Sequence, residues 1–258
     1  MDYLITRKVC LLMVLWASCS VLGRTSERVR SGRPGQSIDT LSVGKEFIQF
    51  QSGIQWDGES SSLKNATNTY SISSLFRFGL TESTELNVEG SYRFDANAAN
   101  PNGFDKTSLG MRFDVLSGEG NEPSLGVQAT YHLNLAEGSL GNRSSGAELL
   151  LATNIPINKK VSATLNLGPK WDGINLNPAI HYVAGVSLTL TPAWFVFVEN
   201  YGNFQNGVFA TFFDTGFGWI TSDDDQWDFS FGIGRNNSVS TYFMSTGYTF
   251  RFSQTNAN

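Results

Sequence analysis

Apolar and polar residues alternate strictly through about a dozen short segments of the chain. In residues 70–78, for example, Ile72 and Phe76 fall on one face, whereas Ser73 and Arg77 fall on the other. Because successive side chains of a strand point to opposite faces, this period-2 pattern predicts strands with one apolar and one polar face.

The pattern predicts twelve strands, separated by turns and loops rich in Gly, Asn, Ser and Pro. They span about 45–56, 70–78, 86–94, 106–116, 123–135, 146–155, 160–171, 179–190, 194–202, 208–220, 227–235 and 240–252. An even number of strands places both chain ends and the shorter turns on one side, and the longer loops, such as 57–68 and 95–105, on the other.

The apolar face is too extensive for a soluble sandwich, which is the alternative architecture. About twelve strands would have to share one apolar face rich in Phe, Tyr and Trp. An inverted arrangement fits better, with apolar side chains facing lipid and polar side chains facing a lumen. The sequence therefore predicts an all-β fold, a single antiparallel transmembrane β-barrel over residues 44–252.

Tryptophan positions support the same interpretation. Five of the six lie near predicted strand ends with outward parity: Trp56, Trp171, Trp194, Trp219 and Trp227. Indole rings prefer the headgroup zone of a membrane, so we expect the first two at the outer rim and the other three at the inner rim. Large core residues of a soluble sandwich would not be confined to strand ends.

Composition agrees with a β-barrel and excludes spanning helices. Charged residues make up 16% of the chain, below the roughly 25% typical of soluble proteins. The mean hydropathy is −0.17, and no run of about 18 apolar residues occurs. Alternation hides the hydrophobicity of the strands from such averages.

The first 23 residues resemble a secretory signal peptide. Arg7 and Lys8 precede a short apolar core, and small residues follow up to a cleavage site predicted after Gly23. A short membrane anchor is the alternative, as is lipidation at Cys19. Cys10 and Cys19 both lie in this segment, so the mature chain would lack disulfides, thiol catalysis and cysteine metal sites.

Residues 24–43, rich in Arg, Ser, Gly and Pro, are predicted to form a flexible periplasmic lead-in, with an ordinary disordered terminus as the simpler alternative. Residues 253–258 would form a C-terminal tail. Without the signal peptide, 16 Lys and Arg face 22 Asp and Glu, a net charge of −6. No basic stripe is present, which argues against nucleic acid as a partner.

Charged residues of inward parity are the candidate functional residues of the lumen, either as selectivity charges or as structural ion pairs. Arg77 should lie opposite Asn87 and diagonal to Glu85 and Glu89. The set comprises Arg77, Glu85, Glu89, Arg93, Arg112, Asp114, Glu148, Lys170, Glu199, Asp214, Asp228 and Arg251. The inward aromatic residues Phe195, Phe197, Tyr201 and Phe243 would narrow the lumen and offer an apolar path.

Catalytic and metal-binding motifs are weak. The two histidines, His132 and His181, have inward parity on different strands and are best explained as hydrogen-bonded lumen residues. No Gly-x-Ser-x-Gly elbow is present, and the acidic turn 223–225 lacks EF-hand spacing. The sequence predicts no enzyme, no cofactor and no metal.

Several hairpins resemble a known family of outer-membrane proteins, labelled "putative meta-pathway of phenol degradation". The similar segments are 76–86 (FRFGLTESTEL), 108–113 (SLGMRF) with 123–125, 227–232 (WDFSFG) and 247–252 (GYTFRF). The resemblance implies an outer-membrane β-barrel that passes small, often aromatic or apolar, compounds. The chain departs from the family at 132–138, where a Pro-Thr-Gly turn is usual.

The sequence as a whole predicts a channel or facilitator for passive passage of small solutes in the outer membrane of a Gram-negative-type bacterium. A structural or adhesive barrel with a plugged lumen is the alternative, and an outer-membrane hydrolase is the third. The expected partners are membrane lipid, a small solute and the outer-membrane assembly machinery.

Overall fold

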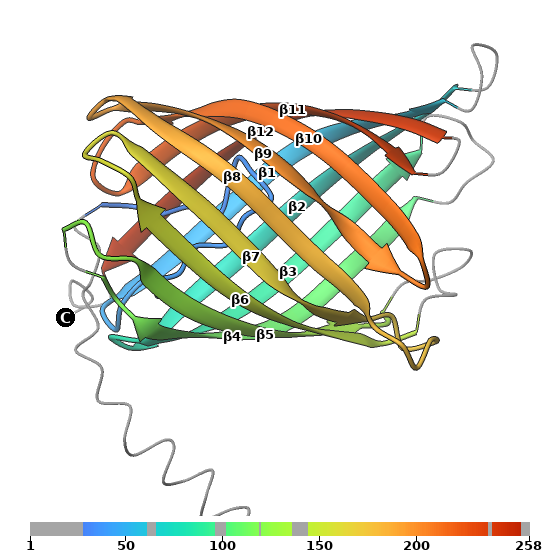
Figure 1. Ribbon diagram of the computed structural model, residues 1–258, viewed down its shortest axis with the longest axis horizontal. Coiled ribbons are helices and arrows are strands. Elements are labelled where there is room, and N and C mark those ends of the chain that lie inside the picture. The colour runs from blue at the N-terminus through green and yellow to red at the C-terminus, as the bar shows by residue number, and fades with distance from the viewer. Residues whose placement is uncertain are drawn as a thin grey trace, which may run out of the picture.

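A computed structural model shows a closed barrel of twelve antiparallel strands (Figure 1). It describes residues 28–60, 66–95, 102–118, 120–135, 144–236 and 239–253. The predicted signal peptide, Trp16, both cysteines and residues 254–258 of the predicted tail lie outside the described residues. No helix in these ranges is long and apolar enough to cross a membrane.

Each strand pairs with its neighbours in sequence, and β1 pairs with β12 to close the barrel. The strands are β1 (Phe47–Ser60), β2 (Ala66–Thr81), β3 (Thr84–Asp95), β4 (Gly103–Leu116), β5 (Ser124–Leu133), β6 (Gly146–Pro156), β7 (Val161–Trp171), β8 (Ala179–Thr191), β9 (Trp194–Gln205), β10 (Val208–Ile220), β11 (Asp225–Asn236) and β12 (Val239–Ser253). The all-β fold and the twelve predicted strands are confirmed.

Two predicted loops are shorter than expected. The β1–β2 ladder continues through Glu59, which pairs with Thr67 on β2 and Thr241 on β12. Both ends of the predicted loop 57–68 therefore belong to strands. Likewise, β4 begins at Gly103, within the predicted loop 95–105. Polar composition indicated loops here, but backbone hydrogen bonding between long hairpin arms outweighs it.

Both described ends of the barrel chain, at β1 and β12, lie at one rim with the turns that follow β2, β6, β8 and β10. We call this the periplasmic rim, because bacterial barrels place short turns there. One connection at the outer rim is equally tight: Asn206 and Gly207 both have positive φ, at 51° and 79°. This Asn-Gly pair is the preferred two-residue turn of a β-hairpin.

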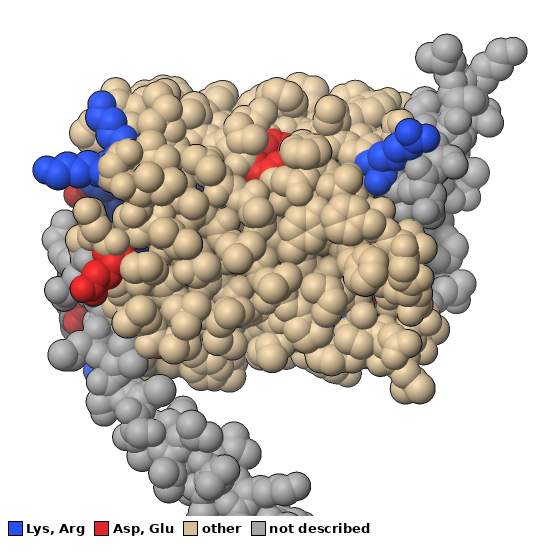
Figure 2. Space-filling model, in the orientation of Figure 1, with Lys and Arg blue, Asp and Glu red and all other residues tan. Residues whose placement is uncertain are grey.

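The outer wall of the barrel is apolar. Large apolar side chains from every strand are exposed on it, including Ile54, Phe76, Leu109, Leu149, Leu167, Val198, Phe217, Phe231 and Met244. Figure 2 shows that the basic side chains on one face lie toward the two ends of the barrel, with little charge between them. An apolar wall around polar interior residues is the arrangement of a transmembrane barrel.

Three of the predicted girdle tryptophans lie side by side at the periplasmic rim. Trp219 pairs in register with both Trp194 and Trp227, and the Trp194 and Trp219 rings stack 5.4 Å apart. Trp171 ends β7 at the outer rim, and Trp56 packs against Tyr242 with ring centroids 5.4 Å apart. Their role as membrane anchors stays a prediction.

Candidate functional site in the barrel lumen

The barrel lumen contains the chain's own N-terminal residues. Residues 28–44, here called the lumen segment, run inside the barrel before β1 begins (Figure 1). Val29, Thr40, Leu41, Ser42 and Val43 are all buried. The prediction of a flexible periplasmic lead-in is therefore wrong for residues 28–43.

The lumen segment starts at the periplasmic rim. The Val29 amide donates to the Asp223 carbonyl at 2.6 Å, and the Arg28 guanidinium donates to the Pro192 carbonyl at 2.9 Å. Arg28 also forms an exposed ion pair with Asp223 at 3.1 Å. These contacts attach the segment to the β8–β9 and β10–β11 turns.

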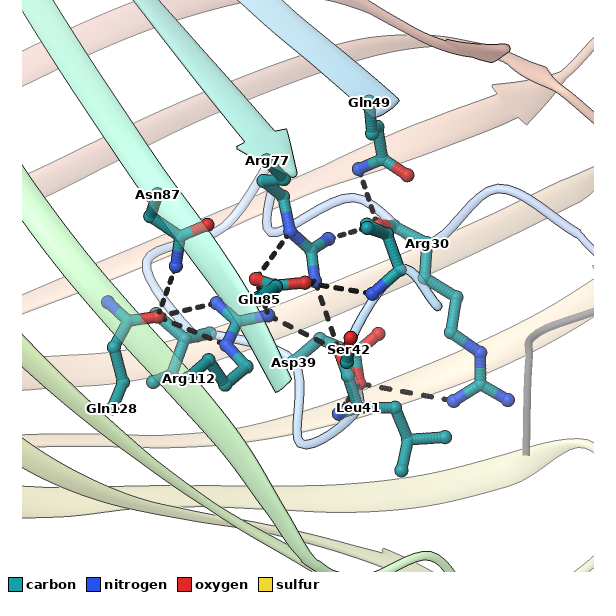
Figure 3. A network of polar contacts seen from close by, with 12 residues as sticks. Arg30, Asp39, Leu41, Ser42, Gln49, Arg77, Glu85, Asn87, Arg112 and Gln128 are labelled. Carbon is teal, nitrogen blue, oxygen red and sulfur yellow. Dashed lines mark hydrogen bonds and ion pairs between the residues drawn. The ribbon is translucent and has the colours of Figure 1, made fainter. Parts of the chain in front are cut away.

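Arg77 on β2 holds two parts of the lumen segment at once (Figure 3). Its Nη1 donates to the Arg30 carbonyl at 2.8 Å, and its Nη2 donates to the Leu41 carbonyl at 3.0 Å. The residues between these two carbonyls form a loop whose base is closed by one guanidinium. Gln49 on β1 reinforces the base by donating its Nε2 to the same Arg30 carbonyl at 2.8 Å.

Glu85 on β3 neutralises this buried guanidinium. It pairs with Arg77 Nε at 2.8 Å and accepts the Val43 amide at 2.8 Å, with Arg112 3.4 Å away (Figure 3). Arg77 and Glu85 are 1% and 0% exposed, so neither charge is solvated by water. Buried charges of this kind require partners, and here the partners are each other and the backbone of the lumen segment.

Asp39 adds a further carboxylate to the base of the loop. Its Oδ1 lies 3.9 Å from Arg30 Nη1. Burial by itself raises the pKa of Asp39, but the positive charges of Arg30, Arg77 and Arg112 outweigh burial and hold the pKa below its usual range. Asp39 therefore stays ionised and attracts the arginines that surround it.

Arg33 anchors the far part of the loop to β11 and β12. Its Nη2 lies 3.2 Å from Asp228 Oδ1 and donates to Ser245 Oγ at 2.7 Å. The guanidinium lies over Gly53 and Gly247, which pair with each other across β1 and β12. A Cβ on either glycine would collide with the guanidinium, so glycine at both positions leaves the room that this side chain occupies.

The opposite wall binds the lumen segment through its backbone. Glu199 on β9 accepts the Gln36 amide at 2.6 Å and the Ser37 hydroxyl at 2.5 Å. Asn166 accepts the Ile38 amide at 2.8 Å, and Asp114 accepts the Ser42 amide at 2.7 Å. A buried segment without secondary structure needs such partners for its amides, and the inward polar residues of the strands supply them.

The predicted lumen charges thus fall into two groups. Those that bind the lumen segment or its immediate neighbours are Arg77, Glu85, Arg112, Asp114, Glu199 and Asp228. Those that pair along the wall are Glu89 with Lys106, Arg93 with Asp105, Glu148 with His181, and Arg251 with Asp224 at the periplasmic rim. Lys170 pairs in register with Glu148, and Asp214 has no hydrogen-bond partner among the described residues.

The histidines are hydrogen-bonded or paired lumen residues, as the sequence indicated. His181 Nδ1 lies 2.6 Å from Glu148 Oε1, and His132 Nε2 lies 3.7 Å from Glu148 Oε2. Within the described ranges, no group of His, Cys, Asp and Glu residues could hold a metal ion.

The sequence predictions did not reveal that the lumen segment provides partners for the lumen charges, above all Arg33. Two charged residues of the barrel wall, Lys106 and Asp57, were also not among the predicted lumen residues. A usable signal was present in the sequence. Arg28, Arg30 and Arg33 precede a barrel whose inward face carries an excess of carboxylates. Complementary charge between a terminus and a lumen is a reason to expect contact between them.

Cavities lie on both sides of the lumen segment. One of about 480 Å³ opens in the outer half between β1, β9, β10, β11 and β12, and one of about 370 Å³ lies in the periplasmic half beside β6–β9. A smaller cavity of about 100 Å³ lies between residues 31–37 and the β7–β9 wall, where Thr164, Gly185 and Ser187 are small. It shares lining residues with the periplasmic cavity but none with the outer cavity.

A closed twelve-stranded barrel with an apolar exterior and a polar interior defines an integral outer-membrane β-barrel protein. The chain matches the family described as "Putative MetA-pathway of phenol degradation" over residues 31–252, and it belongs to this family. The match includes most of the lumen segment. No protein with a curated description matches the chain in sequence.

Three solved structures share the fold at low sequence identity. An outer membrane channel from Pseudomonas putida F1 has a TM-score of 0.65 at 12% identity, covering 87% of this chain and 100% of that one. The NanC porin has a TM-score of 0.55 at 9% identity, covering 77% and 98%. The KdgM porin in complex with oligogalacturonate has a TM-score of 0.53 at 11% identity, covering 78% and 99%.

Proposed function

We propose that the protein is a passive outer-membrane channel for small solutes, in which the lumen segment sets the width of the pore. The observation that carries the proposal is the free space on both sides of the lumen segment, with a further small cavity between the segment and the β7–β9 wall. The proposal is supported by relatives of this fold that are named as channels and porins. Secretion through a cleaved signal peptide and insertion by the outer-membrane assembly machinery belong to the same proposal.

Aromatic or apolar compounds are the proposed solutes. The family description refers to phenol degradation. Of the predicted lumen aromatics, Phe195 and Phe197 line the narrow passage beside the lumen segment, and Tyr201 and Phe243 line the outer cavity. Their rings offer stacking surfaces to an aromatic solute.

Planar-bilayer conductance of the protein, with a heat-shifted gel band as proof of folding, tests the proposal. Discrete conductance steps are the expected result. A folded protein that stays silent would favour the second candidate, a closed barrel without transport. That candidate is motivated by the anchoring of the lumen segment to opposite walls through Arg77, Arg33 and Glu199.

Lumen charge is expected to control ion selectivity in such a channel. Glu199→Gln should lower the ratio of cation to anion permeability about twofold, and Arg93→Gln should raise it by a similar factor, because each removes one fixed charge from the pore. Reversal potentials under a salt gradient measure both effects. Lys159→Gln, in the exposed β6–β7 turn, is the control. Unchanged selectivity in both variants would exclude these two residues as selectivity charges.

A further inference from the structure

Two adjacent rows of the barrel wall beside the outer cavity carry carboxylates and aromatic rings. In the first row, Glu199, Asp214, Gly232, Phe243 and Asp57 are successive partners across β9, β10, β11, β12 and β1. All have inward parity. One continuous strip of wall therefore carries three acids and an aromatic ring.

The second row lies two residues further toward the outer rim. Tyr201 pairs with Phe212, and their rings stack with centroids 5.3 Å apart. The row continues through Gly234 and Thr241 to Glu59. The rings of Phe212 and Phe243 lie over the glycines of their neighbouring strands, where a Cβ would collide with them. Both rings are thereby held flat against the wall beside the acidic row.

Within the described residues, the acids of this strip lack cationic partners. Glu199 accepts hydrogen bonds from neutral donors, and Asp57 accepts one from Gln55 at 2.7 Å. No Lys or Arg in the described parts of the chain forms an ion pair with Asp57, Glu199 or Asp214. The cations nearest in the lumen are already paired, Arg33 with Asp228 and Arg93 with Asp105.

Asp214 is the most unusual member of the strip. It is 3% exposed, and neither carboxylate oxygen has a hydrogen-bond partner in the described ranges, although the side chain of Gln36 lies beside it. Its Cβ lies close to Gly232, which lines the outer cavity. A buried carboxylate without a partner is costly, and a cation in the adjacent cavity would compensate for it.

We propose that the outer cavity is a binding subsite for organic cations, namely protonated or quaternary amines that carry an apolar body. The carboxylates of Asp57 and Glu59, which line the cavity, would neutralise the charged nitrogen, and the faces of Tyr201, Phe212 and Phe243 would contribute cation–π attraction. The cavity volume of about 480 Å³ is in the range of small-molecule sites. The inference deepens the proposed channel function, on which it rests, by assigning a solute class to its lumen.

Calorimetric titration of the full-length protein in detergent with three matched probes tests this inference. Benzyltrimethylammonium carries a positive charge, benzyl alcohol none, and benzoate a negative charge on the same ring. The cation should bind at least about tenfold more tightly than the alcohol, and benzoate more weakly than either. Equal binding of cation and alcohol, or no binding of the cation, would overturn the proposal. The proposal would also be overturned if Mg²⁺ or Ca²⁺ alone displaced benzyltrimethylammonium at a concentration lower than that of benzyltrimethylammonium.

Variants assign the effect to the strip. Asp57→Asn and Glu59→Gln should each weaken binding of the cation about tenfold, and Phe243→Leu severalfold. Glu89→Gln, a lumen carboxylate on another wall that pairs with Lys106 at 2.8 Å, should leave the affinity within about twofold. If Asp57→Asn does not fold, Glu59→Gln alone tests the carboxylates. Equal losses in the Glu89 variant would overturn the assignment. The titration measures binding without transport, so a failure to bind the cation can be distinguished from an absence of conductance in the planar bilayer.

Discussion

Deletion of residues 31–38 is expected to raise single-channel conductance about threefold or more, because it removes the part of the lumen segment that crosses the pore. The geometry allows this deletion. Arg77 holds the carbonyls of Arg30 and Leu41 at the same time, and the Arg30 and Asp39 side chains lie 3.9 Å apart. A short Gly-Gly link between Arg30 and Asp39 would therefore leave the base of the loop in place.

A second variant serves as the matched control for this deletion. Replacing residues 31–38 by about eight Gly and Ser residues keeps the chain length but removes the anchors that Arg33 provides to Asp228 and Ser245. We expect a mobile loop and noisy conductance between the wild-type and deletion values. Unchanged conductance in the deletion variant would show that the lumen segment does not limit the pore. Silence of all three folded proteins would favour a barrel without transport.

Arg77→Met is expected to cost about 3–5 kcal/mol of stability, the range for breaking a buried ion pair by removing one partner. The substitution leaves the Glu85 carboxylate buried at 0% exposure with Arg112 3.4 Å away, and it removes one of the donors to each of two carbonyls of the lumen segment. Urea unfolding of the refolded barrel in detergent measures the loss. The double variant Arg77→Met/Glu85→Met should recover part of it, since the Glu85 carboxylate is then absent, while Arg112 loses this ion pair but keeps its hydrogen bonds to Gln128 and the Leu41 carbonyl.

The same substitution should release the lumen segment. Trypsin cleaves after arginine unless proline follows, so the bond after Arg30, protected in the wild type, should become cleavable in Arg77→Met, whereas Arg33 precedes Pro34 and is not a site. Lys106→Met is the control, because its pair with Glu89 has exposed fractions of 43% and 27% and should contribute only about 0–1 kcal/mol. Equal stability losses in the two variants, or no new cleavage in Arg77→Met, would contradict the central role given to Arg77.

Local register was predictable from the sequence where a hairpin is short. Arg77 lies opposite Asn87 and forms an ion pair with Glu85, as predicted. Period-2 alternation assigns each side chain to a face, and a tight turn leaves few possible pairings between the strands that it joins. The same alternation gave the inward parity of Glu199 and Asp214.

The sequence by itself therefore determined the barrel, its twelve strands, its apolar exterior and the identity of most inward charges, with Lys106 and Asp57 as exceptions. Each of these properties depends on residues that are close in the chain. Only the tertiary structure decided what the inward charges bind. Residues 28–44 have no periodicity, and their partners Arg77, Glu199 and Asp228 lie on strands far apart in sequence. Closure of β1 on β12 brings these strands around one lumen, and the need to satisfy buried backbone groups and charges then places the segment inside it.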